Sequence, residues 1–304
     1  MPPSSIWDDS LSNYYCNGLK VYWETLNQVT SYQARCMTGR NGLDPFDHVV
    51  RLIKSYLGSG GNLRALALGC GEERSYEMRF METGLFSRIE VLDLAAPLLE
   101  RQRRLAIAAG LEGLHYQCRD LNRAELPPAS YDFIWAVGTL HHIERLDHLF
   151  GQVRHSMKDR ALLVVREYVG PNRLQFTARQ LALVNALLKV LPARLKRTTT
   201  GKVKRYETKM AEDALPDPSE AVRSRDILPL LRAHFPNVRV IETGGTILYP
   251  LLQQIAFNFE IDPIGPPALN LLIWLETALI KTGLLPSDFV FCVAARPDSD
   301  RCAN

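Results

Sequence analysis

The sequence predicts an α/β fold: a doubly wound, mostly parallel seven-stranded sheet with helical insertions that act as a lid. Short apolar runs alternate with amphipathic helical stretches between residues 62 and 168, which is typical of parallel βαβ units. Two further strand-like runs follow, each after a long and mostly helical stretch. A length of 304 residues and an apolar content of 46% suit one large packed domain of this class.

The individual elements follow from the spacing of apolar residues. Strands are expected at Arg64–Leu68, Ile89–Leu92, Leu114–Cys118, Phe133–Val137, Ala161–Glu167, Val238–Thr243 and Phe289–Ala294. Helices are expected at Phe46–Leu57, Ala96–Ala109, Leu146–Met157, Leu174–Leu191 and Leu269–Thr282. Long helical connections in such a domain usually form a lid or a substrate pocket.

We expect three zones along the chain. Residues 1–61 form an N-terminal helical segment rich in aromatic residues, which acts as a lid. Residues 62–168 form the cofactor-binding core, and residues 169–304 hold helical lid insertions together with the last two strands of the same sheet. No internal repeat or low-complexity tract interrupts this order.

Composition narrows the function classes. With 36 basic and 33 acidic residues, the net charge of +3 is too small to indicate a general nucleic-acid binder. No apolar run is long enough to span a membrane, and the N-terminal residues do not resemble a signal peptide. The six cysteines lack the spacing of metal ligands, so we expect reduced thiols in a cytoplasmic protein and assign no metal site.

The stretch LALGCGEERSYE, from Leu66 to Glu77, ends the first strand in a Gly-x-Gly turn. Because Gly69 and Gly71 have no β-carbon, the chain can turn tightly there and let a ligand approach the backbone. The N-terminal amides of the helix that follows favour an anionic group. An ordinary strand-to-helix turn without a ligand is the alternative interpretation.

Two acidic residues follow at the ends of the next two strands. Asp93 lies at about the interval after the glycine turn at which nucleotide sites place an acid on ribose hydroxyls. Asp120 follows the third strand, where a carboxylate can accept from an exocyclic amine such as that of adenine, with Leu121 beside the ring. A solvent-exposed acid at a strand end and an acid in a turn remain the alternatives for the two positions.

The third glycine of a dinucleotide site is missing. Arg74 occupies its position, after Glu72 and Glu73. Two carboxylates near a pyrophosphate would repel it. S-adenosylmethionine carries a sulfonium and an amino acid but no phosphate, so this loop suits it better than NAD.

With these residues placed, the chain resembles class I S-adenosylmethionine-dependent methyltransferases, in particular a bacterial small-molecule subgroup. The matching stretches are LALGCG, IEVLDL, CRDLN and YDFIWAVGTLHHI, followed by a helix with LFGQVRHSMK. Their order matches from about residue 62 to residue 168, and EYVGPNRLQFT, DPSEAVRSRDILPLL and GGTILYPLLQQIAFNF extend the similarity. The resemblance implies a Rossmann-like fold with S-adenosyl-L-methionine as the cofactor.

The chain departs from the family pattern at two places. Many relatives read Gly-x-Gly-x-Gly where this chain continues with Glu-Glu-Arg, and MKDRALLVV lacks the glycine-containing turn that is common before the fifth strand.

The resemblance also implies roles for single residues. Gly69 and Gly71 would line the methionine part, Asp93 would hold the ribose, and Asp120 with Leu121 would hold the adenine. Val137 and Gly138 would lie under the sulfonium. The full set expected to bind the cofactor is Gly69, Cys70, Gly71, Asp93, Leu94, Asp120, Leu121, Val137 and Gly138.

Candidate catalytic groups lie after the fourth and fifth strands, because ligands of such sheets bind at the carboxyl ends of the strands. His141 and His142 follow the fourth strand, and each is either a proton acceptor or a packing and capping residue. Glu167 is a candidate base or substrate ligand, or the partner of a neighbouring arginine. Tyr168 is either catalytic or, slightly favoured, a packing residue. Glu167 or Asp217 would suit magnesium, but nothing in the sequence determines a geometry.

The acceptor is expected to contact residues of the third zone. Arg173 and Gln175 follow the fifth strand, and a basic cluster in the first insertion contains Lys202, Lys204 and Arg205. This cluster is either a solvated face or a clamp for an anionic head group such as a phosphate or diphosphate. Apolar helices and the aromatic N-terminal segment would enclose a lipophilic body.

The sequence therefore favours a methyltransferase that acts on a small molecule in specialised metabolism. Nucleic acid is not expected as the acceptor, since the charge is modest and no Asn-Pro-Pro-Tyr-type motif occurs. An NAD-dependent oxidoreductase and a family member that binds the cofactor without methyl transfer are the alternatives. Protein or peptide acceptors and a homodimer are left open.

Overall fold

The computed structural model describes residues 15–16, 18–71, 75–208 and 217–296. Its centre is a seven-stranded sheet with the strand order β5-β4-β3-β6-β7-β9-β8. The strands are β3 (Leu63–Leu68), β4 (Phe86–Asp93), β5 (Leu114–Cys118), β6 (Tyr131–Val137), β7 (Met157–Tyr168), β8 (Arg239–Gly244) and β9 (Phe289–Ala295). Strand β9 runs antiparallel to β7 and β8, and the other paired strands of this described sheet are parallel. The doubly wound, mostly parallel seven-stranded sheet is confirmed.

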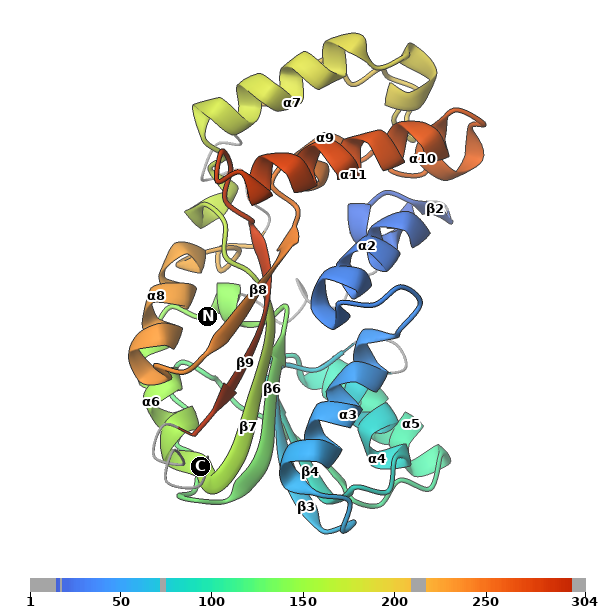
Figure 1. The fold of residues 1–304 in the computed structure, drawn as a ribbon. Helices are drawn as coiled ribbons and strands as arrows, with labels where there is room; N and C mark the ends of the chain where they lie inside the picture. Colours follow the sequence, from blue (N-terminus) through green and yellow to red (C-terminus); the bar gives the residue numbers. More distant parts are fainter. Residues whose placement is uncertain (1–14, 17, 72–74, 209–216, 297–304) are drawn as a thin grey trace.

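Helices cover both faces of this sheet (Figure 1). One face carries α3 (Pro45–Leu57), α4 (Tyr76–Glu82) and α5 (Ala96–Ala108), and the other carries α6 (Leu146–Ser156) and α8 (Ser224–His234). Each face has its own apolar core. The strand order reverses between β3 and β6, so the loops that follow these two strands run in opposite directions. In such folds, ligands bind in the crevice between these loops, at the carboxyl ends of the strands.

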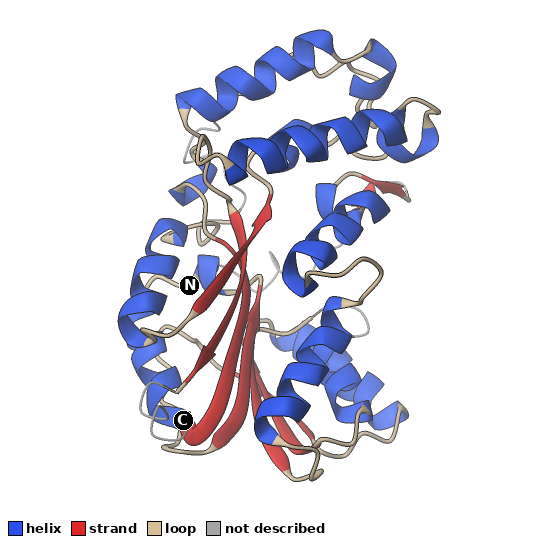
Figure 2. Cartoon of the chain, in the orientation of Figure 1, coloured by secondary structure: helices blue, strands red, loops and turns tan. Residues whose placement is uncertain are grey.

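A third apolar core lies beyond the carboxyl ends of the parallel strands, under a layer of helices (Figures 1 and 2). The layer contains α2 (Asn27–Thr38), α7 (Ala178–Val190), α9 (Leu248–Leu252), α10 (Asn258–Ile261) and α11 (Gly265–Lys281). Trp23 in the turn η2 (Trp23–Thr25) is fully buried in it. The remaining short elements are β1 (Tyr15–Cys16), which pairs with β2 (Leu19–Lys20), and the turns η3 (Leu140–His142), η4 (Asn172–Leu174) and η5 (Ala193–Lys196).

Local chemistry explains where the helices begin. The Asp44 carboxylate accepts the N–H of Phe46 and so caps α3, which starts at a proline. At α7, Thr177 and Gln180 form a capping box, so the helix begins at Ala178 rather than at Leu174 as expected. Residues 172–174 form a turn instead, since Arg173 and Leu174 have positive φ angles of 56° and 52°.

A buried acid supports the short helix α9. The carboxylate of Glu276, on α11, accepts the N–H groups of Gly245, Ile247 and Leu248. The carboxylate thus satisfies amides at the start of the helix that would otherwise lack partners. Burial raises the pKa of Glu276 despite these hydrogen bonds.

Candidate active site

The glycine turn after β3 is held against the loop that follows β6. Gly69 has a φ of +91°, and a β-carbon there would lie 2.0 Å from Oγ1 of Thr139. Glycine is therefore required at position 69 because the backbone there passes close to the side chain of Thr139. At Gly71, a β-carbon would lie 3.2 Å from that of Ser75. The expectation for residues 72–74 falls outside the described residues.

Asp93 at the end of β4 holds this turn in place. Its Oδ2 accepts the N–H of Cys70 and its Oδ1 accepts the N–H of Ala95, both at 2.8 Å. A carboxylate offers about four acceptor positions, so capacity remains for two sugar hydroxyls. The same side chain thus shapes the glycine turn and presents acceptors at the edge of the sheet.

The residues expected around the adenine differ in exposure. Leu94 leaves 41% of its surface exposed directly after Asp93, which is unusual for leucine and provides an apolar surface. Asp120 is half-buried, and its Oδ1 accepts the backbone N–H of Asn122 at 2.9 Å. Leu121 is buried in the core of its face of the sheet, and a contact of this residue with the adenine ring stays a prediction.

Val137 and Gly138 end β6 beside the glycine turn. Val137 is half-buried, and Gly138 has a positive φ of 62°. The N–H of Gly138 donates to the carbonyl of Arg166 at 3.0 Å, which joins the end of β6 to β7. The predicted cofactor residues therefore gather at the carboxyl ends of β3, β4, β5 and β6.

Sequence reasoning missed one acid beneath the glycine turn. Glu77, in the first turn of α4, leaves only 1% of its surface exposed and accepts from Sγ of Cys70 at 3.5 Å. Burial raises the pKa of Glu77 to about 7. Glu77 directly follows Ser75 and Tyr76 in the sequence, where the neighbouring Glu72 and Glu73 are more conspicuous.

Glu167 lies at the end of β7 with its carboxylate turned inward. Its Oε2 accepts the N–H groups of Thr139 and Leu140 at 2.8 and 2.6 Å, and its Oε1 accepts that of Tyr168 at 2.8 Å. Oε1 also lies 2.5 Å from Nδ1 of His141. The side chain is 0% exposed, and a direct contact of Glu167 with the acceptor stays a prediction. Among the described residues, its ion-pair partner is His141 and not an arginine.

His141 is instead the group that faces outward. Its Nδ1 is bound to Glu167, and its Nε2 lies 3.8 Å from Oε1 of Glu220. Burial alone would lower the pKa of His141, but the carboxylates of Glu167, Glu220 and Asp217 raise it to about 9. Burial tends to raise the pKa of Glu167, yet His141 and the backbone amides hold it below its usual range.

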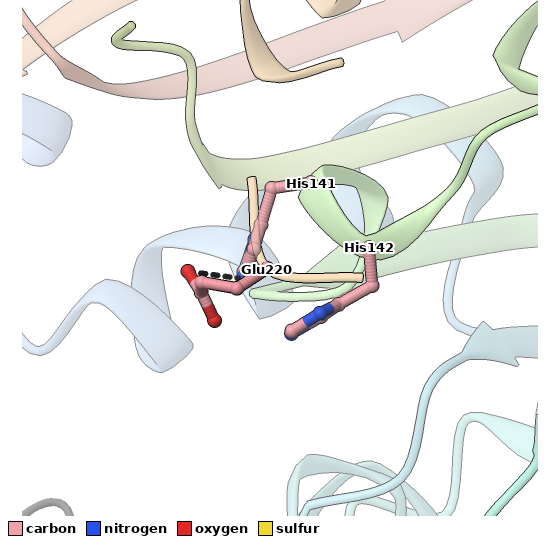
Figure 3. Close-up of side chains that lie close together, drawn as sticks. All are labelled: His141, His142 and Glu220. Carbon is pink, nitrogen blue, oxygen red and sulfur yellow. Dashed lines mark ion pairs between the residues drawn. The ribbon is translucent and has the colours of Figure 1, made fainter. Parts of the chain in front are cut away.

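His142 faces a second carboxylate. Its Nδ1 lies 3.1 Å from Oγ of Ser219 and 3.3 Å from Oδ2 of Asp217. The rings of His141 and His142 are neighbours, with centroids 4.1 Å apart. Figure 3 shows both rings extending from η3 toward Glu220, which comes from a segment far along the chain.

That segment is attached to η3 by the backbone. The N–H of Val222 donates to the carbonyl of His141 at 3.0 Å. Arg173 donates its own N–H to the carbonyl of Ala221 and its guanidinium to the carbonyl of Pro218. Arg173 therefore positions the segment that carries Glu220, and its contact with an acceptor stays a prediction.

Two more predicted residues have structural contacts. The Tyr168 hydroxyl is buried and donates to the carbonyl of Pro171, which favours the packing interpretation, while a catalytic role stays a prediction. Gln175 donates from Nε2 to the carbonyl of Arg173 at 3.3 Å.

The predicted basic residues of the first insertion differ in their contacts, and Lys204 is bound within the fold. Nζ of Lys204 donates to the carbonyls of Pro250 and Gln253 at 2.7 and 3.2 Å and pairs with Glu207. Lys204 thus ties its segment to α9, and a contact between Lys204 and an acceptor stays a prediction.

Lys202 and Arg205 are exposed. Their segment follows η5 at the outer end of the helical layer, well away from the turn η3 (Figure 1). A contact between these two residues and an acceptor stays a prediction.

Part of the chain matches a known protein family. The family model "Methyltransferase domain" matches residues 66–165. Among solved structures, an S-adenosylmethionine-dependent methyltransferase from Mesorhizobium loti is 20% identical, with 81% of this chain and 96% of that chain covered and a TM-score of 0.46.

Two other solved structures are also similar. Geranyl diphosphate C-methyltransferase from Streptomyces coelicolor A3(2) is 12% identical, with 86% of each chain covered and a TM-score of 0.43. Phosphoethanolamine N-methyltransferase 2 from Haemonchus contortus is 14% identical, with 90% of this chain and 58% of that chain covered and a TM-score of 0.47. No curated protein sequence matches the chain significantly.

The family match spans the strands β3 to β7, including the glycine turn, Asp93 and the histidine pair. Residues 66–165 therefore match a methyltransferase domain, which supports the resemblance to S-adenosylmethionine-dependent methyltransferases.

Proposed function

We propose that this protein is an S-adenosylmethionine-dependent methyltransferase that acts on a small molecule. The observation that carries the proposal is the meeting of two groups at one edge of the sheet. The glycine turn anchored by Asp93 supplies a nucleoside site, and the fixed pair of Glu167 and His141 lies directly beside it, across the contact between Gly69 and Thr139.

The residues at this edge suit the cofactor. Asp93 retains acceptor capacity for ribose hydroxyls, and exposed Leu94 offers an apolar surface for the purine. S-adenosyl-L-methionine supplies the methyl group and the positively charged sulfonium when it is bound. The chain's contribution is to hold the nucleoside in one orientation, because methyl transfer is an in-line displacement that depends on positioning.

The acceptor is proposed to lie on the side of β6 and β7. There, Nε2 of His141 faces outward while Glu167 fixes the ring from behind. We assign Glu167 as the positioning residue and His141 as the residue that contacts the reacting end of the acceptor. A buried carboxylate that accepts three backbone N–H groups in addition to the imidazole cannot rotate freely, so the ring has one orientation.

The apolar lid supports a lipophilic acceptor. The layer of α2, α7, α9 and α11 encloses its own core of large apolar side chains beyond the strand ends. An anionic head group, as in a phosphate or diphosphate, would depend on Lys202 and Arg205. If replacing both by glutamine leaves the KM of every active acceptor unchanged, the head-group part of the proposal fails. The resemblance to bacterial small-molecule enzymes supports a role in specialised metabolism.

Calorimetry with two ligands tests the cofactor class. We expect the purified chain to bind S-adenosylhomocysteine at one site and not to bind NADH. Binding of NADH without binding of S-adenosylhomocysteine would instead favour an oxidoreductase.

A turnover assay tests methyl transfer itself. The chain is incubated with methyl-labelled S-adenosylmethionine and small-molecule extracts, and label in organic products is followed together with S-adenosylhomocysteine. Products that depend on the chain are the expected result. Tight cofactor binding without any labelled product across extracts would favour a member that binds the cofactor without methyl transfer.

A further inference from the structure

Three side chains beside the glycine turn are arranged like the ligands of a metal ion. One ligand atom each from His141, His142 and Glu220 lie within 4.8 Å of one another. Bonds of about 2.0–2.2 Å place two ligands of one ion about 3–4 Å apart, so side-chain shifts of less than about 1 Å complete the geometry. Within the part of the chain that the structure describes, no other three such groups gather in this way.

The outer partners of the histidines match those of metal-binding imidazoles. A histidine that binds a metal almost always donates its other ring N–H to a carboxylate, a carbonyl or water. Nδ1 of His141 lies 2.5 Å from the buried Glu167, which directs Nε2 toward Glu220. His142 has Asp217 at 3.3 Å in the same relation.

The charge of the cluster favours a cation. Three carboxylates, those of Glu167, Asp217 and Glu220, surround two imidazoles within ion-pair distance. No lysine or arginine within the described residues forms an ion pair with any of these carboxylates. Even with both imidazoles protonated, the three carboxylates leave a net negative charge, which favours a cation.

The backbone also holds the cluster together across a long sequence separation. The hydrogen bond from Val222 to the carbonyl of His141 and the contacts of Arg173 fix residues 218–221 against η3. These contacts distinguish Glu220 from an acid on a loop that is not attached to the rest of the fold. The site therefore consists of prearranged side chains from two stretches that are far apart in the sequence.

We propose that His141, His142 and Glu220 bind one divalent first-row transition-metal ion, such as Fe²⁺ or Zn²⁺. Two histidines and one carboxylate form the ligand set of many sites that hold these ions and leave further positions open. An all-oxygen site would instead suit Mg²⁺, so nitrogen ligands argue for a transition metal.

This inference rests on the proposed function for its chemical consequence. An open position on the ion would bind an oxygen of the acceptor, a hydroxyl or an enol, and lower its pKa. The oxygen then forms the new bond to the methyl carbon as the carbon–sulfur bond breaks, leaving S-adenosylhomocysteine, and the oxygen's proton passes to solvent. The inference thus narrows the acceptor to an oxygen nucleophile that can bind a metal.

Metal analysis of the full chain tests the site without any acceptor. The chain is stripped with a chelator, loaded anaerobically with Fe²⁺, Zn²⁺ or Co²⁺, desalted, and its metal content measured by mass spectrometry. We expect about one ion per chain. With Co²⁺, visible absorption bands typical of nitrogen and oxygen ligation should appear, which is a readout independent of activity.

Variants locate the ion. His142→Ala and Glu220→Gln should each lower the metal affinity at least about 10-fold, since loss of a ligand removes one bond. Exposed His155→Ala and exposed Glu112→Gln are the matched controls and should load like the wild type. Loss of metal with unchanged binding of S-adenosylhomocysteine would separate this site from the cofactor site.

Two results would overturn the proposal. The first is a wild-type chain that retains no ion after loading with any of the three metals. The second is full metal content in folded Glu220→Gln and His142→Ala, as judged by an unchanged melting temperature, because the ion would then lie elsewhere. A failure of S-adenosylhomocysteine to bind would count against the proposed function and not against the metal site.

Discussion

The two halves of the proposed site, one for the cofactor and one for the acceptor, are built in different ways. On the cofactor side, the contacts join neighbouring strand ends, as between Cys70 and Asp93, and each residue follows a predicted strand. On the acceptor side, His141, Glu167 and Glu220 come from three stretches that are brought together only by the fold. Local signals therefore identify the first half, whereas the second depends on tertiary contacts.

His141 has one buried carboxylate partner, Glu167, and one partly exposed carboxylate partner, Glu220. Glu167 is fully buried behind His141, whereas the side chain of Glu220 in front of it is 28% exposed. The first carboxylate is thus part of the fold, and the second can bind something that enters from solvent.

The largest expected effect is a loss of stability when Glu167, the buried partner of His141, is replaced. Glu167→Gln removes the charge that pairs with His141 and places an amide donor among backbone donors. Breaking a buried pair from one side costs about 3–5 kcal/mol of stability. Urea unfolding followed by circular dichroism measures the loss. Glu220→Gln is the control and should lose far less. Equal stability of the Glu167→Gln variant and the wild type would show that the buried pair does not hold the acceptor side together.

Gly69→Ala should break the contact between the halves. Its φ of +91° opposes any side chain, and the new methyl would lie 2.0 Å from Oγ1 of Thr139. Strain and crowding together cost about 2–5 kcal/mol. Gly84→Ala is the matched control, since Gly84 has a φ of +70° but no atom within 4 Å of the added carbon. Thermal unfolding of both variants should therefore show the larger loss for Gly69→Ala, and equal losses would contradict a close contact with Thr139.

Stability should depend on pH through Glu77 on the cofactor side. Burial raises its pKa from 4.5 to about 7, so between these values the folded chain binds a proton that the unfolded chain has lost. Stability from this group is present below about pH 4.5 and falls as the pH rises to about 7. Relative to Glu77→Gln, the wild type should lose roughly 3 kcal/mol of stability across this interval. Urea unfolding at several pH values measures it, and parallel pH profiles of the two chains would refute the assignment.

The smallest expected loss of stability comes from the ion pair that joins the N-terminal segment to β7. The Arg166 guanidinium lies 2.7 Å from Glu24, and both side chains are mostly buried. Glu24→Gln should cost about 1–2 kcal/mol, as expected for a hydrogen bond between charged groups. Exposed Glu100→Gln is the control and should leave the melting temperature unchanged. Hydrogen exchange of α2 should rise in Glu24→Gln, and unchanged exchange would show that this pair does not fasten the segment.

The sequence predicted the core well because its signals are local. All seven strands appear where apolar runs predicted them, and β5 (Leu114–Cys118) has the predicted bounds. β7 is longer than expected, since it starts at Met157 directly after α6 and needs no glycine turn. These elements depend on apolar periodicity, which is readable without knowledge of distant contacts.

The acceptor side was harder to predict for a physical reason. Glu167 and Lys204 are charged residues, and charged residues are rarely buried unless they are paired. Their partners, His141 for one and carbonyls near α9 for the other, lie 26 and 46–49 positions away. Position after a strand therefore located Glu167 correctly but did not reveal which way its carboxylate points.

The most direct test of the central claim is the affinity of Asp93→Asn for S-adenosylhomocysteine. Isothermal titration should show binding to one site in the wild type and at least about 10-fold weaker binding in Asp93→Asn, because a charged hydrogen bond contributes about 1.5–3 kcal/mol. Asp132→Asn is the matched control, since Asp132 also accepts a neighbouring backbone N–H but lies at the opposite end of the sheet. It should bind like the wild type. Full affinity in Asp93→Asn, or no binding by the wild type, would contradict the account.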